Sequence, residues 1–560
     1  MKIAVVGTSN SIRLDGYFPM YQAIEYPNTV DNLSLGGSNC QLIPYSIEKY
    51  KIFDNYDFLI TDCAVNDGDY LSNALRTPDW LYNELYSIMS MIKEAPIRHV
   101  HLVFPYDIPY KEHYTIHCQV CQELEIPYID IEKILITSSR LGQKELYFDK
   151  QHISYFLSKQ IAYLIKEKRK NLFSKPAIKN TSSCYKSKKY IFYSLPEKFK
   201  TAFPLCTKAS SLLTNDFILL KNSDTLFLDD LPAMDLESIF FWTNTKAGYF
   251  SLASEKHAQN YNLFYQENQY MYFRPIPYRP FPVNKFLKLQ VGLDPNYPVS
   301  PPEFTPEPLY TDNNELILNS FLFSQPLNPP LSWKEKKLPD TSEQYIAAFQ
   351  RIYAFMTTVP LLANNDKFKY VSADYIYIAA HLYPQNQILR REFVKRIKKA
   401  DNPYFLCAYV KLHVLPRKKY SMAVKLLKHV LAQTIIPAAA ADLVHCFIEL
   451  KQYEEALKNV QLISERRYTI KYVQLLCTIY TRMNVPDLFF KNAQKILALN
   501  EGYSYLIDLI DDCVAMKKYR EALQYLQILF EDTRNFAYKK RYDIIMKKME
   551  EIQAEIKNQE

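Results

Sequence analysis

The chain has 560 residues, 48% of them hydrophobic and 23% charged, which is the balance of a globular protein. This length exceeds what one hydrophobic core supports and predicts about three or four domains. The formal net charge of +8 is small for such a length. It does not indicate nucleic acid as a partner.

Residues 1–170 alternate short apolar strands with amphipathic helices. This alternation predicts an α/β domain with a parallel sheet and helices on both faces. Ligands of such sheets bind outside the carboxyl ends of the strands. The expected strands are Ile3–Val6, Val30–Leu35, Phe58–Thr61, His99–Phe104 and Pro127–Ile129, and the expected helices are Trp80–Lys93, Glu112–Glu123 and His152–Glu167.

Ser9 is the candidate nucleophile, because it follows the first strand at a tight turn that contains Gly7. A serine displayed there can attack an acyl carbon, but it needs a base. His152 is the candidate base, and Asp149, three residues earlier, would hold and stabilise its imidazolium. Ser11, two residues after Ser9, is the alternative nucleophile.

The candidate oxyanion donors are the Ser9 amide, the Gly37 amide and the Asn66 side chain, all expected at strand ends. Acyl transfer places negative charge on the former carbonyl oxygen, so donors must already point at it. Gly37 has no side chain, which lets a substrate approach the backbone closely. Gly36 is the alternative donor if the turn is shifted by one residue.

The order of these motifs resembles the SGNH (GDSL-type) hydrolase superfamily, whose pattern is Gly-Asp-Ser, a Gly, Gly-x-Asn-Asp and Asp-x-x-His. The resemblance covers about the first 165 residues. It implies a flavodoxin-like sheet, a triad of Ser9, Asp149 and His152, and an oxyanion hole of Ser9, Gly37 and Asn66. The matching segments are Gly7-Thr8-Ser9, Asn32-Leu33-Ser34-Leu35-Gly36-Gly37, Ala64-Val65-Asn66-Asp67 and Asp149-Lys150-Gln151-His152.

Two residues depart from that pattern. Thr8 stands where the pattern has Asp, and Ala64 stands where it has Gly. The chemistry assigns neither position a proton or a donor, so the departures concern the shape of the substrate more than the mechanism.

A second group of polar residues is a candidate metal site. Positions 113, 117 and 121 fall on one helical face and could ligate zinc. Their spacing fits no common structural zinc pattern, so we expect no metal and a helix that packs buried thiols beside the sheet. The alternating His99 and His101 are expected to pack or to face substrate. The group comprises His113, His117, Cys118 and Cys121.

Residues 171–189 are expected to be a basic linker, because nine basic residues face one acid between Lys166 and Lys189. A surface for acidic polysaccharide or anionic lipid is the alternative. Aromatic, β-prone segments then predict a β-rich, sandwich-like domain over residues 190–290. Phe241 and Trp242 could stack on sugar rings or pack in its core. Prolines predict an extended connector over residues 291–342.

Residues 343–560 predict an all-α domain that contains a repeat. Lys418-Lys419-Tyr420-Ser421-Met422-Ala423-Val424 recurs 33 residues later at Lys451–Leu457 and again at Lys517–Leu523, with a degenerate copy at Asn484–Phe490. This period and its Tyr-x-x-Ala-Leu signature resemble tetratricopeptide-like helical hairpins. Hairpins of this kind stack into a solenoid that can bind protein partners.

The expected function is acyl transfer through a Ser9 acyl-enzyme, with acetyl-CoA as donor, no bound cofactor, and a capsular or other surface polysaccharide as acceptor. The choice of polysaccharide is analogy. One alternative is a carbohydrate esterase or deacetylase with the same triad. Another is a non-catalytic scaffold that binds proteins through the repeats.

The expected location is cytoplasmic, at most peripheral at the inner membrane face. The ten cysteines are scattered without a disulfide spacing, which indicates free thiols in a reducing compartment. The first apolar run reaches a turn too early for a signal peptide. The sequence contains no apolar run of about 18 residues that would indicate a membrane span.

Overall fold

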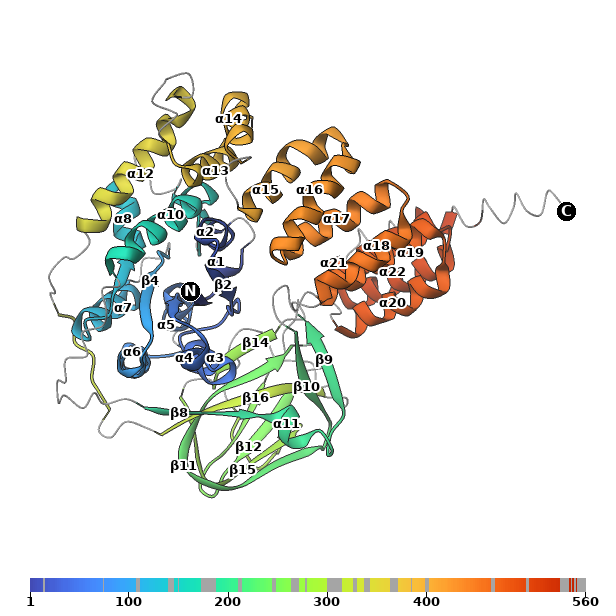
Figure 1. Ribbon diagram of the computed structural model, residues 1–560. Coiled ribbons are helices and arrows are strands. Elements are labelled where there is room, and N and C mark those ends of the chain that lie inside the picture. The colour runs from blue at the N-terminus through green and yellow to red at the C-terminus, as the bar shows by residue number, and fades with distance from the viewer. Residues whose placement is uncertain are drawn as a thin grey trace.

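A computed structural model gives the architecture of the chain (Figure 1). It contains a five-stranded parallel sheet, a nine-stranded antiparallel sheet, a two-stranded sheet and a long series of helices. The structure describes residues 1–13, 16–73, 75–106, 111–138, 146–149, 151–172, 188–209, 214–243, 248–262, 271–276, 279–299, 315–325, 330–336, 343–362, 371–383, 385–397, 402–464, 469–499, 503–533, 543–544, 546–547 and 550.

The amino-terminal part is built on the parallel sheet, in the order β2-β1-β3-β4-β5. The strand segments are short and apolar, and residues 3–6 of β1 are fully buried because helices cover both faces. The expected parallel sheet is confirmed, with strand bounds shifted by a few residues. The strands are β1 (Lys2–Val6), β2 (Thr29–Asn32), β3 (Phe58–Thr61), β4 (Arg98–Val103) and β5 (Tyr128–Asp130).

Two sets of helices cover the sheet. One face packs against α2 (Tyr17–Glu25), α8 (Ile131–Ser138) and α10 (Tyr155–Leu172). The other packs against α3 (Leu42–Tyr50), α6 (Pro78–Glu94) and α7 (Glu112–Glu123). Three short helices complete this part: α1 (Ser9–Ile12), α4 (Ile52–Asn55) and α5 (Ala64–Ser72).

The expected helix His152–Glu167 begins later than predicted. His152 lies on β7 (His152–Ile153), which pairs with β6 (Tyr147–Asp149), and the helix starts at Tyr155. Asp149 Oδ1 accepts the backbone N–H groups of Gln151 and His152, both at 2.9 Å. These bonds hold the backbone in a turn, so His152 cannot join the helix.

The antiparallel sheet follows the order β13-β12-β15-β11-β16-β10-β9, with β14 paired to β11 and β8 paired to β16. The 18-residue strand β11 pairs with β15 and β16, and register shifts in both pairings mark bulges. Bulges bend a strand and increase its twist. The strands are β8 (Lys189–Ser194), β9 (Leu205–Ala209), β10 (Thr214–Lys221), β11 (Thr225–Trp242), β12 (Tyr249–Ala253), β13 (Ala258–Asn262), β14 (Met271–Pro275), β15 (Phe281–Val291) and β16 (Glu315–Gln325), with the short helix α11 (Leu195–Phe199) after β8.

The prediction that residues 291–342 form an extended proline-rich connector is wrong for residues 315–325. These residues form β16, which pairs with β8, β10 and β11. This segment carries no proline and is largely apolar, although prolines flank it. Pro282 also lies in a strand, as the second residue of β15, before the part of β15 that pairs with β12. β15 has an edge at this point, which is where strand prolines are tolerated.

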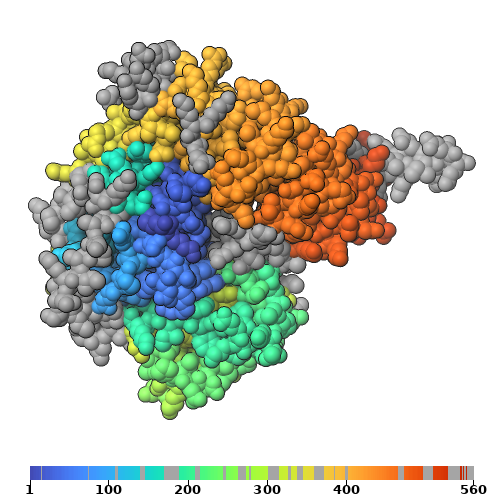
Figure 2. Space-filling view, viewed as in Figure 1, coloured from blue at the N-terminus to red at the C-terminus, as the bar shows by residue number. Residues whose placement is uncertain are grey.

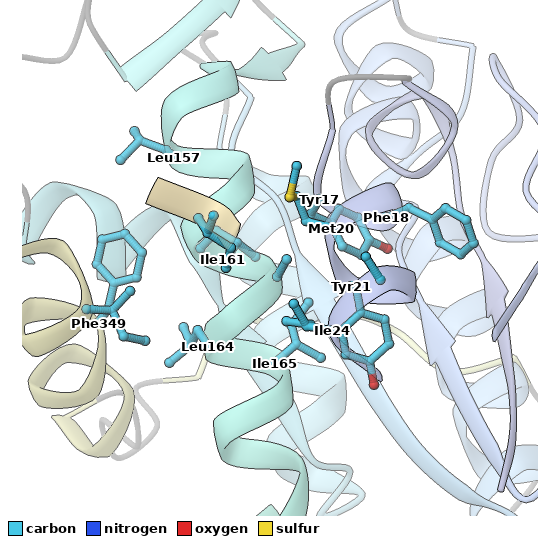
Figure 3. Packing of buried hydrophobic residues seen from close by; sticks show 14 of the residues in the cluster. Tyr17, Phe18, Met20, Tyr21, Ile24, Leu157, Ile161, Leu164, Ile165 and Phe349 are labelled. Atoms are coloured by element: carbon cyan, nitrogen blue, oxygen red, sulfur yellow. The ribbon is translucent and has the colours of Figure 1, made fainter. Parts of the chain in front are cut away.

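The first helices after residue 343 belong to the core of the amino-terminal part. α12 (Glu343–Leu362) packs on α8 and α10. Figure 3 shows Phe349 of α12 facing Leu157, Ile161 and Leu164 of α10. In Figure 2 the amino-terminal part (blue) lies between the antiparallel part (green) and the α12–α14 region (yellow). α13 (Ala373–Leu382) and α14 (Gln387–Ile397) contribute to the same core.

Helical hairpins form the remaining described chain. The residues Lys418, Lys451, Asn484 and Lys517 each have positive φ, from 53° to 60°, and recur every 33 residues. Each precedes the second helix of a pair, so the sequence period is also a structural period. α15 (Pro403–Tyr409) is continued by a π-helix (Val410–Val414) and a 3-10 helix (Leu415–Arg417). The helices that follow are α16 (Tyr420–Gln433), α17 (Pro437–Glu449), α18 (Tyr453–Ser464), α19 (Thr469–Met483), α20 (Pro486–Leu499), α21 (Tyr503–Ala515) and α22 (Tyr519–Thr533).

Among the described residues, no helix combines the length and the apolar character that crossing a membrane requires.

Candidate active site

Ser9 starts α1 directly after β1, at the carboxyl end of the parallel sheet. Its side-chain oxygen is buried and has no hydrogen-bond partner within the described chain. A buried hydroxyl without a partner is uncommon, because an unmade hydrogen bond costs about 1–3 kcal/mol. The structure therefore holds Ser9 Oγ free for another group.

Asp62, at the end of β3, holds the turn that carries Ser9. Its Oδ1 accepts the Thr8 N–H at 3.0 Å and the Thr8 hydroxyl at 3.1 Å. A Cβ atom on Gly7 would lie 2.3 Å from Asp62 Oδ2, so only glycine permits this approach. Burial raises the pKa of Asp62, and its hydrogen bonds oppose that rise. The sequence signal for Asp62 was its position directly after a strand.

Ser11, the alternative nucleophile, lies in a different environment. Its hydroxyl donates to Asp62 Oδ2 and lies 2.7 Å from the Tyr17 hydroxyl, and the residue is 1% exposed. These bonds occupy the Ser11 hydroxyl with partners inside the protein. The structure thus favours Ser9 over Ser11.

Asp149 and His152 form a hydrogen-bonded pair. His152 Nδ1 lies 2.7 and 2.8 Å from the two carboxylate oxygens of Asp149. Burial alone would raise the pKa of Asp149, but the hydrogen bond with His152 brings it below its usual value. The other ring nitrogen, His152 Nε2, is buried and has no hydrogen-bond partner in the described chain.

The pair lies beside the nucleophile turn. β7, which carries His152, contacts α1, and the Asn10 side-chain amide donates to the Gln151 carbonyl at 3.1 Å. Ser9 Oγ and His152 Nε2 are the two atoms that general-base catalysis would join. Both lack a hydrogen-bond partner among the residues that the structure describes, and they lie on contacting elements. Catalytic hydrogen bonds of this kind often form only when substrate binds.

Arg13 was not singled out from the sequence, yet it contacts the acid of this pair. One guanidinium nitrogen lies 3.6 Å from Asp149 Oδ2. The guanidinium also lies 4.4 Å from the centre of the Phe148 ring and 4.8 Å from that of Tyr155. These contacts fasten the Asp149 loop to the end of α1.

Besides the Ser9 amide, the candidate oxyanion donors lie on two neighbouring segments, the loop after β2 and the start of α5. Gly37 has a φ of 71°, a conformation that favours glycine, and lies in the exposed part of the loop after β2. A Cβ on Gly36 would lie 2.9 Å from Ile12, so Gly36 lets this loop approach α1. Both amides remain candidates. Asn66 lies in the first turn of α5 and is 5% exposed.

Asp67, the residue after Asn66, ties these segments together. Its Oδ1 accepts the Cys40 N–H at 3.0 Å, and its Oδ2 lies 3.0 Å from His117 Nε2. Burial raises the pKa of Asp67 to about 7 and lowers that of His117 to about 3. The motif contained Asp67, but its spacing gave no sign of a histidine partner.

The histidines and cysteines of α7 that were considered as metal ligands have different surroundings. His113 packs against the Tyr106 ring, whereas His117 turns toward Asp67. Cys63, His101 and His117 are the group in the described chain whose donor atoms lie within 4.8 Å of one another. His99 and His101 lie in the interior, at 6% and 0% exposure, and do not face a substrate.

Phe241 and Trp242 are 2% and 1% exposed, so they cannot stack on a sugar ring. Phe241 packs in the core of the antiparallel part, and Trp242 packs where that part meets the amino-terminal part. Of the two alternatives for these rings, packing in the core is confirmed and contact with a sugar is excluded, because both sides of β11 are covered at this point.

No family model matches the sequence, and no curated protein does. Solved structures do match. A two-domain esterase, CEX, active on acetylated mannans and crystallised with mannopentaose, is 15% identical with a TM-score of 0.41, covering 58% of this chain and 90% of that one. The acetyl xylan esterase AlAXEase is 15% identical with a TM-score of 0.25, covering 29% and 96%. A lipolytic G-D-S-L family protein from Veillonella parvula is 18% identical with a TM-score of 0.26, covering 30% and 97%.

Two of these neighbours are esterases and the third is a lipolytic protein of the G-D-S-L family. Their TM-scores lie below 0.5, so the chemistry assigned to this chain rests on the residues of its own site.

Proposed function

We propose that this chain is a serine esterase that removes acyl groups from a carbohydrate through a Ser9 acyl-enzyme. One observation carries the proposal. Ser9 Oγ and His152 Nε2 are buried on contacting elements with no partner among the described residues, while Asp149 binds the other nitrogen of His152. This is the arrangement that a nucleophile, a base and an orienting acid require.

In the first half of the reaction, Ser9 Oγ attacks the acyl carbon and its proton passes to His152 Nε2. Asp149 stays ionised and stabilises the imidazolium. The Ser9 and Gly37 amides and the Asn66 side chain donate to the oxyanion. The C–O bond to the sugar then breaks, and His152 returns the proton to the departing sugar hydroxyl. A water molecule then attacks the acyl carbon of the acyl-enzyme and gives its proton to His152. The bond to Ser9 Oγ breaks, Ser9 regains its proton, and the free acid leaves.

Water is favoured as the acceptor because the acid side of the site is open to solvent. The Asp149 side chain is 44% exposed and Phe148 is 56% exposed. Transfer to another sugar requires that the acyl-enzyme exclude water while it waits. Transfer from acetyl-CoA to a polysaccharide hydroxyl, as expected from the sequence, would use the same residues and differ only in donor and acceptor.

The test measures acetate released from p-nitrophenyl acetate, acetylated mannan and acetyl xylan, the polymers being chosen from the neighbours' substrates. A parallel arm supplies acetyl-CoA with unacetylated polysaccharide and follows free CoA. We expect acetate release that falls roughly 10³-fold or more in Ser9→Ala. Ser72→Ala, an exposed serine at the end of α5, is the matched control and should keep full activity.

Other outcomes identify the alternatives. Sugar-dependent CoA release that Ser9→Ala abolishes would replace the esterase with the transferase. Activity that is absent in every arm, or unchanged in Ser9→Ala, would contradict serine catalysis and favour a scaffold that binds partners through the helical hairpins.

A further inference from the structure

Five buried polar side chains behind the candidate site form one continuous line of hydrogen bonds, here called the histidine chain. His99 Nε2 lies 2.8 Å from Thr61 Oγ1, which lies 2.7 Å from His101 Nδ1. His101 Nε2 lies 2.8 Å from His117 Nδ1, and His117 Nε2 lies 3.0 Å from Asp67 Oδ2. The members come from β3, β4, α7 and α5, and none is more than 6% exposed.

The hydrogen bonds of this chain can run in a single direction when Asp67 is ionised. Burial lowers the pKa of all three histidines, so they are neutral, and a neutral imidazole has one donor and one acceptor nitrogen. The carboxylate only accepts, so His117 donates from Nε2 and accepts at Nδ1 from His101. His101 then accepts at Nδ1 from the Thr61 hydroxyl, which accepts from His99. All three histidines therefore carry their proton on Nε2.

The far end of the chain reaches the candidate oxyanion hole. Asp67 Oδ1 accepts the N–H of Cys40, at the end of the loop that contains Gly37. Asp67 also directly follows Asn66 in the first turn of α5. One carboxylate thus links the segments that carry two of the candidate donors, Gly37 and Asn66.

We propose that the histidine chain is a positioning device for the oxyanion donors. His117 orients the Asp67 carboxylate, and Asp67 fixes the Gly37 loop against the turn that carries Asn66. The inference rests on the proposed function, which gives these two donors their role. Asp67 and His117 are positioning residues, because they act through Gly37 and Asn66.

A bound metal ion is the competing explanation for these residues, since Cys63, His101 and His117 could ligate zinc. The two facing nitrogens, His101 Nε2 and His117 Nδ1, are 2.8 Å apart, which is the length of a hydrogen bond. A shared proton accounts for that distance directly. The two explanations differ at one atom, because a metal on His101 Nε2 would move its proton to Nδ1.

The first measurement is the tautomer of each histidine by long-range ¹H–¹⁵N NMR on full-length protein labelled at its ten histidines. It is made at about pH 9, because burial raises the pKa of Asp67 to about 7 and the carboxylate must be ionised. Metal content is measured on the same sample. We expect His99, His101 and His117 to be Nε2–H tautomers and the protein to be metal-free. His101 protonated on Nδ1, or one equivalent of zinc that survives dialysis against EDTA, would overturn the proposal.

The second measurement compares kcat and KM for p-nitrophenyl acetate among folded variants. Asp67→Asn can still accept from Cys40 but not from His117, so we expect kcat to fall about 10- to 100-fold with KM nearly unchanged, less than the ~10²- to 10³-fold loss on deleting an oxyanion donor. The kcat of His117→Leu should fall by a similar factor. His117→Gln keeps a donor near the position of Nε2, so it should retain most of the wild-type kcat.

Cys121→Ala is the control, because Cys121 is buried one turn further along α7 and lies outside the histidine chain. It should lower stability without changing kcat. Equal losses of kcat in Cys121→Ala and Asp67→Asn, or wild-type kcat in folded Asp67→Asn, would contradict the positioning role. If the wild type has no esterase activity the proposed function fails, whereas the tautomers still decide whether the histidine chain exists.

Discussion

At the scale of single residues, Ser9 and Ser11 show how two serines in one short helix acquire different roles. Both belong to α1, two positions apart. Ser11 is bonded to Asp62 and Tyr17, whereas Ser9 Oγ has no partner in the described chain. The difference arises because successive helical residues point in directions about 100° apart.

Ser11→Ala should therefore affect stability more than activity. It leaves the buried Asp62 without one donor, which costs about 1–3 kcal/mol. We expect a lower urea midpoint and a kcat that stays within a few-fold of wild type, the reverse of Ser9→Ala. Urea unfolding and ester hydrolysis on both variants check this. A folded Ser11→Ala protein without activity would mean that the nucleophile was assigned to the wrong serine.

At the scale of elements, the carboxy-terminal hairpins repeat a strained residue. Lys451 has a φ of 57° between α17 and α18, and its N–H donates to the Ile448 carbonyl at 2.9 Å. A left-handed conformation costs a residue with a Cβ about 1–2 kcal/mol, whereas glycine adopts it freely. The 33-residue period thus recurs in backbone geometry as well as in side chains.

Lys451→Gly should stabilise its hairpin by about 1 kcal/mol. The same substitution at Lys458, an exposed residue inside α18, should destabilise it by roughly 0.5–1 kcal/mol. Hydrogen exchange of α17 and α18 measures both effects: we expect slower exchange in Lys451→Gly and faster exchange in Lys458→Gly. Faster exchange in both variants would show that residue 451 is not held in the left-handed conformation.

At the scale of the whole molecule, a buried lysine links the amino-terminal part to the antiparallel sheet. Lys188 lies between Glu84 of α6 and Glu237 of β11, with its amine bonded to Glu84 and 2.6 Å from Glu237 Oε1. Both glutamates are fully buried, and Gln41 donates to each of them. Burial and the charge of Glu237 raise the pKa of Glu84, which Lys188 opposes.

Lys188→Met should destabilise the protein by roughly 3–5 kcal/mol, since it leaves two buried carboxylates without a cation. Without Lys188 the pKa of Glu84 rises further above its unfolded value, so stability is lost as pH rises through the folded pKa. The deficit in thermal unfolding temperature should be larger at pH 8 than at pH 5. Lys189→Met, at an exposed neighbour, should change little. An equal deficit at both pH values would contradict the ionic role of Lys188.

The sequence by itself determined the features that depend on local pattern. Strand alternation predicted the parallel sheet, and a 33-residue period predicted the hairpins. Motif order predicted that Ser9, Gly37, Asn66 and the Asp149–His152 pair belong to one site. The periodic signals recur at the spacing of a helix turn, a strand pleat or a hairpin. They can therefore be recognised in the sequence without knowing which segments pack together.

Only the tertiary structure decided what depends on residues far apart. Asp62 bonds to Tyr17, which lies 45 positions away in the sequence, and Asp67 bonds to Cys40, which lies 27 positions away. Strand β16 joins the sheet from a segment that prolines flank. Helix α12 was expected in a separate domain, yet its apolar face joins the core of the first. The sequence shows that an apolar residue tends to be buried and that a buried polar residue needs a partner. Which residue becomes the neighbour or partner is decided by tertiary packing, and local sequence spacing does not encode it.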